Sequence, residues 1–186
     1  MTCIVGIEDG PRVWMGGDSA QTDTHCDRVV GVEPKVFIKD GVIFGCTGSI
    51  RMKQVLRHHL VIPEQTTAMS DEAWLCGPLV DSIRDLFRKS GLMRTKDGSE
   101  EADGCMLVGY RGCLYVMECG FALIRSNRGW ETAGSGAPYA SGALATLASL
   151  EHTVPRNNIM TALEAAAACN ASVCAPFTIL QQRGTL

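Results

Sequence analysis

The sequence predicts an α+β fold in four layers, an αββα sandwich in which two antiparallel sheets lie face to face and a helix pair covers each outer face. The expected elements run as several strands, two helices, several strands, two helices and one closing strand. This segregation argues against an alternating βαβ sheet. Glycine-containing turn dipeptides separate neighbouring apolar runs, and the helical stretches carry apolar residues on one face. We expect one domain over residues 1–186, because 46% hydrophobic content is ample for one core.

The strands are expected to form hairpins. Residues 2–8 and 12–17 are short apolar runs on either side of the turn signal Asp9-Gly10-Pro11. Asp40-Gly41 joins a strand that Lys35 opens to a partner that Gly48 closes. The polar segments 19–27 and 94–103 are predicted to be loops. Further strands are expected at 105–110 and 113–118 around Arg111-Gly112, and at 28–30, 121–125, 130–133 and 177–180.

The first helix is expected to begin at Ser49 and to end before Pro63. Its apolar positions are Ile50, Val55, Leu56 and Leu60, and its predicted outer positions are Arg51, Lys53 and Arg57.

Three further helices follow. Ser70 caps the second, which closes at Ser90-Gly91 and should kink or start late at Gly77-Pro78. Alanine-rich helices are expected from about 137 to 150 and from about 154 to 170. Their small outer faces suit close packing against another copy.

Composition and charge exclude several functions. The net charge of -3 and the lack of a basic stripe argue against nucleic-acid binding, and no apolar run approaches the ~20 residues of a membrane span. Nine cysteines occur without a Cys-x-x-Cys pair or a signal peptide, so we expect reduced thiols in a cytoplasmic protein. His58-His59 and His25-Cys26 lack the convergent ligands of a zinc site. We therefore expect no metal and no cofactor.

The first residues after Met1 carry the chemistry. Aminopeptidases remove an initiator methionine before a small residue, so the mature chain is expected to begin at Thr2. Thr2 would then hold a hydroxyl and an α-amine whose reference pKa is near 8, so that one residue supplies nucleophile and base. The alternative is that Thr2 only precedes a buried strand. Asp18 follows the second strand, where its carboxylate should lie near the start of the first.

Five motifs in this order resemble the threonine peptidases of the proteasome β-subunit type, within them the HslV-like branch. They are Thr2-Cys3-Ile4-Val5, Gly16-Gly17-Asp18, Lys35-Val36, Gly45-Cys46-Thr47-Gly48 and Gly134-Ser135-Gly136-Ala137-Pro138-Tyr139. The resemblance implies an N-terminal nucleophile hydrolase fold. It also implies a self-compartmentalising homo-oligomeric ring that cleaves peptides or unfolded proteins, with an AAA+ unfoldase as a possible partner.

The resemblance also implies a role for each site residue. Thr2 would be the nucleophile with its amine as base, Lys35 would lower the pKa of the threonine site, and Asp18 would hold Lys35. Gly48 would supply an oxyanion-hole N–H, and Ser135 would bond the terminal amine. The expected substrate contacts are Thr22 and Ile50 beside the substrate strand and Cys46 in the specificity pocket.

Two departures from the family pattern stand out. The family's acid near the end of the last long helix is missing here, where Asn170 or Ser172 could substitute. Glu33 precedes Lys35 and suggests a preference for basic substrate side chains. No propeptide is expected before Thr2, so that retention of Met1 would leave the chain inactive.

Two other functions stay open at this point. One is an N-terminal nucleophile amidase that acts on small amides. The other is a proteasome-like shell protein with impaired catalysis, which the missing acid near Asn170 suggests.

Overall fold

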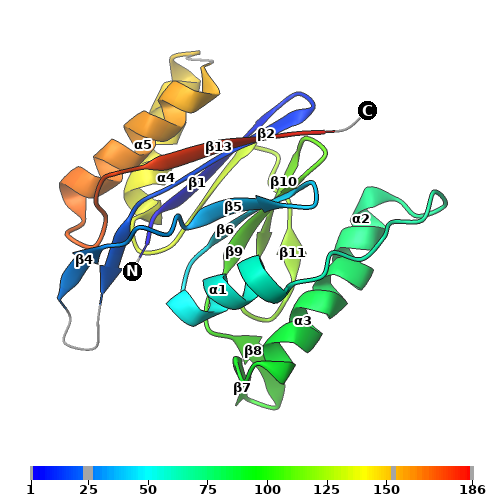
Figure 1. The fold of residues 1–186 in the computed structure, drawn as a ribbon. Helices are drawn as coiled ribbons and strands as arrows, with labels where there is room; N and C mark the ends of the chain where they lie inside the picture. Colours follow the sequence, from blue (N-terminus) through cyan, green and yellow to red (C-terminus); the bar gives the residue numbers. More distant parts are fainter. Residues whose placement is uncertain (1, 23–26, 152–153, 185–186) are drawn as a thin grey trace.

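The computed structural model describes residues 2–22, 27–151 and 154–184. Two antiparallel sheets form its centre (Figure 1). The four-stranded sheet has the order β12-β1-β2-β13 and the five-stranded sheet the order β11-β10-β9-β6-β5. The first comprises Trp130–Ala133 (β12), Ile4–Asp9 (β1), Arg12–Gly17 (β2) and Thr178–Arg183 (β13). The second comprises Leu123–Ile124 (β11), Cys113–Met117 (β10), Met106–Tyr110 (β9), Val42–Cys46 (β6) and Val36–Lys39 (β5).

The helices lie outside these sheets. They are α1 (Ile50–His59), α2 (Asp71–Trp74), the π-helical η1 (Leu75–Leu79), α3 (Val80–Lys89), α4 (Ala137–Ser149) and α5 (Pro155–Cys169). Helices α4 and α5 pack together over β1 and β2, whereas α1 and α3 lie on the side of the five-stranded sheet (Figure 1). The predicted α+β class is confirmed.

Three apolar clusters fill the spaces between these elements. Neighbouring residues of a strand face opposite sides of its sheet, so Val5 packs with Ile159 of α5 whereas Ile4 lies in the cluster between the two sheets. Phe44 of β6 and Leu56 of α1 belong to the third cluster, on the other side of the five-stranded sheet. Strand β1 is therefore buried on both faces, and this fixes the start of the chain.

The predicted hairpins at 2–17, 35–48 and 105–118 are confirmed by the pairings β1–β2, β5–β6 and β9–β10. Two predicted loops are wrong in part. Residues 93–102 form a hairpin of Met93–Lys96 (β7) and Ser99–Ala102 (β8), with Asp97 and Gly98 at positive φ in its turn. Ala20–Thr22 (β3) pairs with Arg28–Val30 (β4), and the loop prediction for 23–26 falls outside the described residues.

Two helix predictions also need correction. The second helix does not start late, since α2 begins at Asp71, and Gly77 and Pro78 lie in the π-helical η1, whose wider turn accommodates a residue without an N–H donor. Lys53, predicted on the outer face of α1, is only 4% exposed because its aliphatic stem is buried and its amine meets Glu33. In the described part of the chain, no helix is long and apolar enough to cross a membrane.

Candidate active site

Thr2 lies just before β1, buried at 4% exposure and held by the loop that follows β12. Its nitrogen donates to Ser135 Oγ at 3.2 Å, and its carbonyl accepts from the Gly136 N–H at 3.1 Å. Gly134 has φ +96°, and a Cβ there would lie 2.2 Å from the Thr2 carbonyl oxygen. Only glycine lets the loop pass so close. The loop thus brings Ser135 to the nitrogen that would become the terminal amine.

Asp18 connects three parts of the chain around Thr2. One carboxylate oxygen accepts from the Cys3 N–H at 2.8 Å and from Lys35 Nζ at 2.8 Å. The other accepts from the Ala20 N–H at 2.9 Å. The Asp18 side chain is fully buried and that of Lys35 is 7% exposed. The expected proximity of Asp18 to the first strand is therefore observed, and the same carboxylate fixes the position of the Lys35 amine.

Burial is the largest influence on Lys35. It lowers the pKa of the ammonium from its usual 10.5, because a charge is poorly solvated there. The charge of Asp18 and its hydrogen bond to Lys35 act in the opposite direction. While it is charged, the Lys35 ammonium favours the deprotonated form of a neighbouring group.

Gly48 follows β6 and precedes α1, and its conformation requires glycine. Its φ is +79°, and a Cβ would lie 1.9 Å from the Asp103 carbonyl oxygen. Ser49 caps α1 by accepting from the Met52 N–H, so the positive end of the helix dipole lies next to Gly48. We find no acceptor for the Gly48 N–H among the described residues. This N–H and the helix terminus suit a developing oxyanion.

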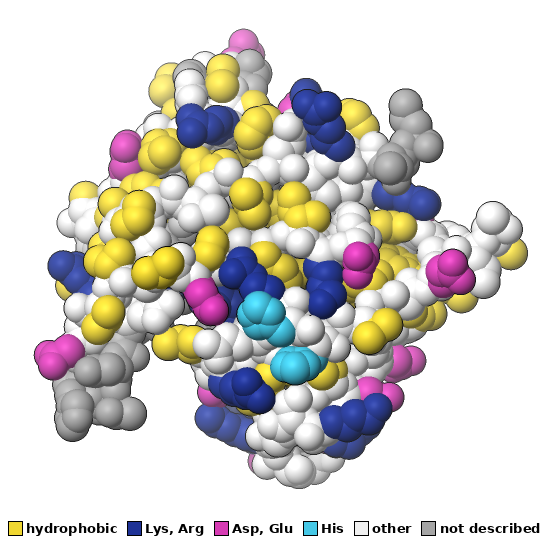
Figure 2. All heavy atoms as spheres, viewed as in Figure 1, with side chains coloured by type: hydrophobic (Ala, Val, Ile, Leu, Met, Phe, Trp, Pro, Cys, Tyr) yellow, Lys and Arg dark blue, Asp and Glu magenta, His cyan; other side chains and the backbone are white. Residues whose placement is uncertain are grey.

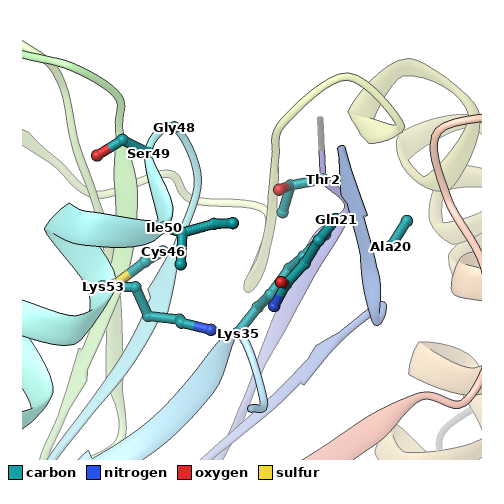
Figure 3. Close-up of a pocket in the computed structure, with 9 residues that line it drawn as sticks. All are labelled: Thr2, Ala20, Gln21, Lys35, Cys46, Gly48, Ser49, Ile50 and Lys53. Atoms are coloured by element: carbon teal, nitrogen blue, oxygen red, sulfur yellow. The ribbon is translucent and has the colours of Figure 1, made fainter. Parts of the chain in front are cut away.

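A cavity of about 210 Å³ brings most of these residues together. Figure 3 shows the Thr2 hydroxyl facing Ile50 and α1 across it. Its lining comprises Thr2, Ala20, Gln21, Lys35, Cys46, Gly48, Ser49, Ile50 and Lys53. Asp18 and Ser135 lie behind this lining and hold Lys35 and Thr2. Thr22 ends β3, but its side chain falls outside the described residues.

Sequence reasoning missed four lining residues, namely Ala20, Gln21, Ser49 and Lys53. The sequence predicts Lys53 on the outside of α1, although its spacing of three from Ile50 puts both residues on one side of the helix. Gln21 belongs to a predicted loop but is part of β3. Glu33, which suggested a preference for basic side chains, is not in the cavity lining. It pairs with Lys53 at 3.3 Å.

Asn170 occupies the region where the family pattern has an acid. Its Nδ2 donates to the Ser135 carbonyl at 2.9 Å, and its Oδ1 accepts from the Ser172 N–H at 2.9 Å. The side chain thus ties the end of α5 to the loop that holds Thr2. Asn170 therefore holds the backbone of Ser135 by a hydrogen bond to its carbonyl, a role that the sequence alone did not indicate.

Two buried thiols, those of Cys3 and Cys46, lie near Thr2. Burial raises the pKa of both Cys3 and Cys46 to about 12, so neither competes with Thr2 as a nucleophile. Within residues 2–22, 27–151 and 154–184, no group of three or more His, Cys, Asp or Glu side chains could hold a metal ion. His25 and Cys26 lie outside the described residues.

Comparison with known proteins gives structural matches only. No protein-family profile matches the chain, and no curated protein matches it either. Among solved structures, BPH of Thiobacillus denitrificans in complex with epoxomicin matches with a TM-score of 0.81 at 14% identity, over 100% of both chains. HslV of Trypanosoma brucei matches with a TM-score of 0.69 at 17% identity, over 98% of this chain and 99% of that one.

A third match is the Anbu complex of Pseudomonas aeruginosa, solved as a helical assembly. Its TM-score is 0.67 at 13% identity, over 98% of this chain and 81% of that one. Identities this low establish the architecture and not the activity. Agreement over almost the whole chain shows that this protein has the proteasome β-subunit type of N-terminal nucleophile hydrolase fold.

Proposed function

We propose that this protein is a threonine endopeptidase whose nucleophile is the hydroxyl of Thr2 after removal of Met1. One observation carries the proposal. A single cavity is lined by a hydroxyl at the second residue, by a buried ammonium fixed by Asp18, and by a glycine next to a helix N-terminus. These are the groups that an acyl-transfer reaction requires.

Removal of Met1 converts the Thr2 nitrogen from a peptide nitrogen into an α-amine. In the proposed first step, this amine takes the hydroxyl proton while the Thr2 oxygen attacks the substrate carbonyl carbon. The carbonyl oxygen becomes an oxyanion that accepts from the Gly48 N–H near the start of α1. The C–N bond then breaks, and the leaving nitrogen receives the proton from the Thr2 ammonium.

The second half of the reaction releases the acyl group. The amine deprotonates a water molecule that attacks the ester carbon, and the Thr2 oxygen recovers its proton. The ammonium of Lys35 lowers the pKa of the terminal amine, and Asp18 keeps the ammonium in place. Ser135 orients the amine and Asn170 positions the Ser135 backbone.

The test compares chains that differ only at the start. A removable fusion exposes either Thr2 or Met1 as the first residue, and Thr2→Ala serves as the inactive control. We expect cleavage of peptide-aminocoumarin substrates and covalent addition of epoxomicin, detected by intact mass, only when Thr2 is first. Epoxomicin is chosen because it is bound to the structurally similar BPH. Equal rates for the Thr2 chain and Thr2→Ala would refute the proposal. Activity on small amides alone would favour the amidase. Absence of both labelling and cleavage would favour the shell protein.

We further propose that the layers form the αββα sandwich of this hydrolase type and that copies assemble into a closed or helical array. Two observations support assembly. The similar Anbu complex is a helical assembly, and Val29, Val30 and Val32 expose apolar side chains in and beside β4. Such patches are typical of protein interfaces. Light scattering tests this proposal, and a monomer at micromolar concentration would refute it. A partner unfoldase stays a prediction from the resemblance.

A further inference from the structure

The charged side chains that line the Thr2 cavity are both cations, and each is paired with a carboxylate outside the lining. Lys35 and Lys53 line it, and among the described residues no Asp or Glu does. Lys35 is paired with Asp18 behind the cavity wall. Lys53 is paired with Glu33, whose side chain is 41% exposed and lies outside the lining. Cys46 contributes no negative charge, because burial raises the pKa of its thiol to about 12.

The position of Lys53 suits a side chain that enters from the substrate. Its stem is buried, and in Figure 3 its side chain extends from α1 past Ile50 toward Lys35. Ile50 lies three residues earlier on the same side of α1. A substrate side chain at this wall therefore meets an aliphatic surface first and an ammonium beyond it.

The ammonium has capacity for another acceptor. It carries three N–H donors, and in the described structure the carbonyl and one carboxylate oxygen of Glu33 account for two. The hydrogen bond and then the charge of Lys53 lower the pKa of Glu33, desolvation opposes this, and the charges of Arg57 and His58 add smaller effects in the lowering direction. Figure 2 shows Lys and Arg side chains gathered around the histidines at the end of α1. A carboxylate is thus stabilised here and an ammonium repelled.

We infer that Lys53 selects peptide substrates with glutamate or aspartate at the residue whose carbonyl Thr2 attacks. This inference rests on the proposed peptidase function and names the substrate class of that site. It is opposite to the preference for basic side chains that Glu33 suggested from the sequence. A glutamate side chain matches the wall, since its methylene groups meet Ile50 and its carboxylate meets the ammonium.

The experiment uses four peptide-aminocoumarin substrates that differ only in the last residue, which is Glu, Gln, Leu or Lys. We expect kcat/KM of the processed wild type to be at least about tenfold higher for Glu than for its neutral isostere Gln, and lowest for Lys. Lys53→Met should abolish the ratio of Glu to Gln, and Lys53→Arg should retain it. Arg51→Met, an exposed change of equal charge on the same helix, should leave the ratio unchanged.

The outcomes separate the two proposals. Cleavage of Gln and Glu peptides at equal rates by wild type, or an unchanged ratio in Lys53→Met, overturns the selectivity and leaves the peptidase function standing. Failure of wild type to cleave any of the four peptides overturns the proposed function and this inference with it. The wild-type ratio decides the matter even where Lys53→Met does not fold.

Discussion

Replacement of Asp18 by asparagine isolates the contribution of the buried ion pair. The substitution keeps the shape of the side chain but removes the charge opposite Lys35, which lies 2.8 Å away in an almost fully buried environment. Loss of one partner of a buried pair leaves an uncompensated charge and costs about 3–5 kcal/mol. We expect the free energy of unfolding of Asp18→Asn to fall by this amount near neutral pH, as measured by urea titration at fixed protein concentration.

Two further variants show whether the unpaired charge of Lys35 causes the loss of stability in Asp18→Asn. Asp85→Asn removes a carboxylate at the same 2.8 Å from an arginine, but its side chain is 59% exposed, so the loss should stay below about 1 kcal/mol. Addition of Lys35→Met to Asp18→Asn removes the unpaired cation and should recover about 1–2 kcal/mol without restoring activity.

The pH dependence of this loss has a definite sign. Without Asp18, an influence that raises the pKa of Lys35 is gone, so the already lowered pKa falls further. As the pH rises through that pKa, the amine becomes neutral and no longer needs a counter-charge. The destabilisation by Asp18→Asn should therefore shrink as the pH rises toward 10.5, the usual pKa of a lysine. A loss no larger than that of Asp85→Asn, or one that grows with pH, would refute the reasoning.

Three other predictions follow from the site. Gly48→Ala should abolish peptide cleavage and lower the melting temperature, since its Cβ would meet the Asp103 carbonyl; a fully active variant would contradict this. The value of kcat/KM should rise with pH as the Thr2 amine loses its proton, at a pH below the reference pKa of about 8 because Lys35 lowers that pKa. It should fall again as Lys35 loses its proton, at a pH below 10.5, the usual pKa of a lysine. Asn170→Ala should lower the free energy of unfolding by only about 1–2 kcal/mol yet reduce kcat, because the Ser135 carbonyl loses the hydrogen bond from Asn170. Peptide cleavage assays measure the effect on kcat, and thermal melts measure the effect on stability.

Local turn chemistry explains how much of the fold was predictable. Asp40-Gly41 specifies a tight hairpin through its positive φ values, and the structure confirms it. Asp97-Gly98 carries the same signal, yet the hairpin β7–β8 was missed because its strands are charged and exposed. Without apolar alternation, a strand resembles a loop in sequence.

The site shows a different limit. Thr2 and Asp18 could be associated because the pairing of β1 with β2 places them at one end of a hairpin, whereas Lys35 joined them only through the family resemblance. Lys53 could not be predicted as a site residue, since helical periodicity classifies a lysine as outward-facing and carries no information about the partner of its amine. Its burial depends on Glu33 from a separate segment, and such a long-range contact leaves no mark on the local pattern of α1.

The contacts of Asp18 and its neighbour Ser19 reach the far end of the polypeptide. The Ser19 N–H donates to the Cys174 carbonyl at 3.0 Å, and the Ser19 hydroxyl donates to the Pro176 carbonyl. These two residues precede β13, which completes its sheet beside β2. The residue next to Asp18, which holds the ammonium of Lys35, is thus fixed by the segment that leads into β13. Under the proposed function, a copy in which β13 has not docked would lack part of the support of its nucleophile.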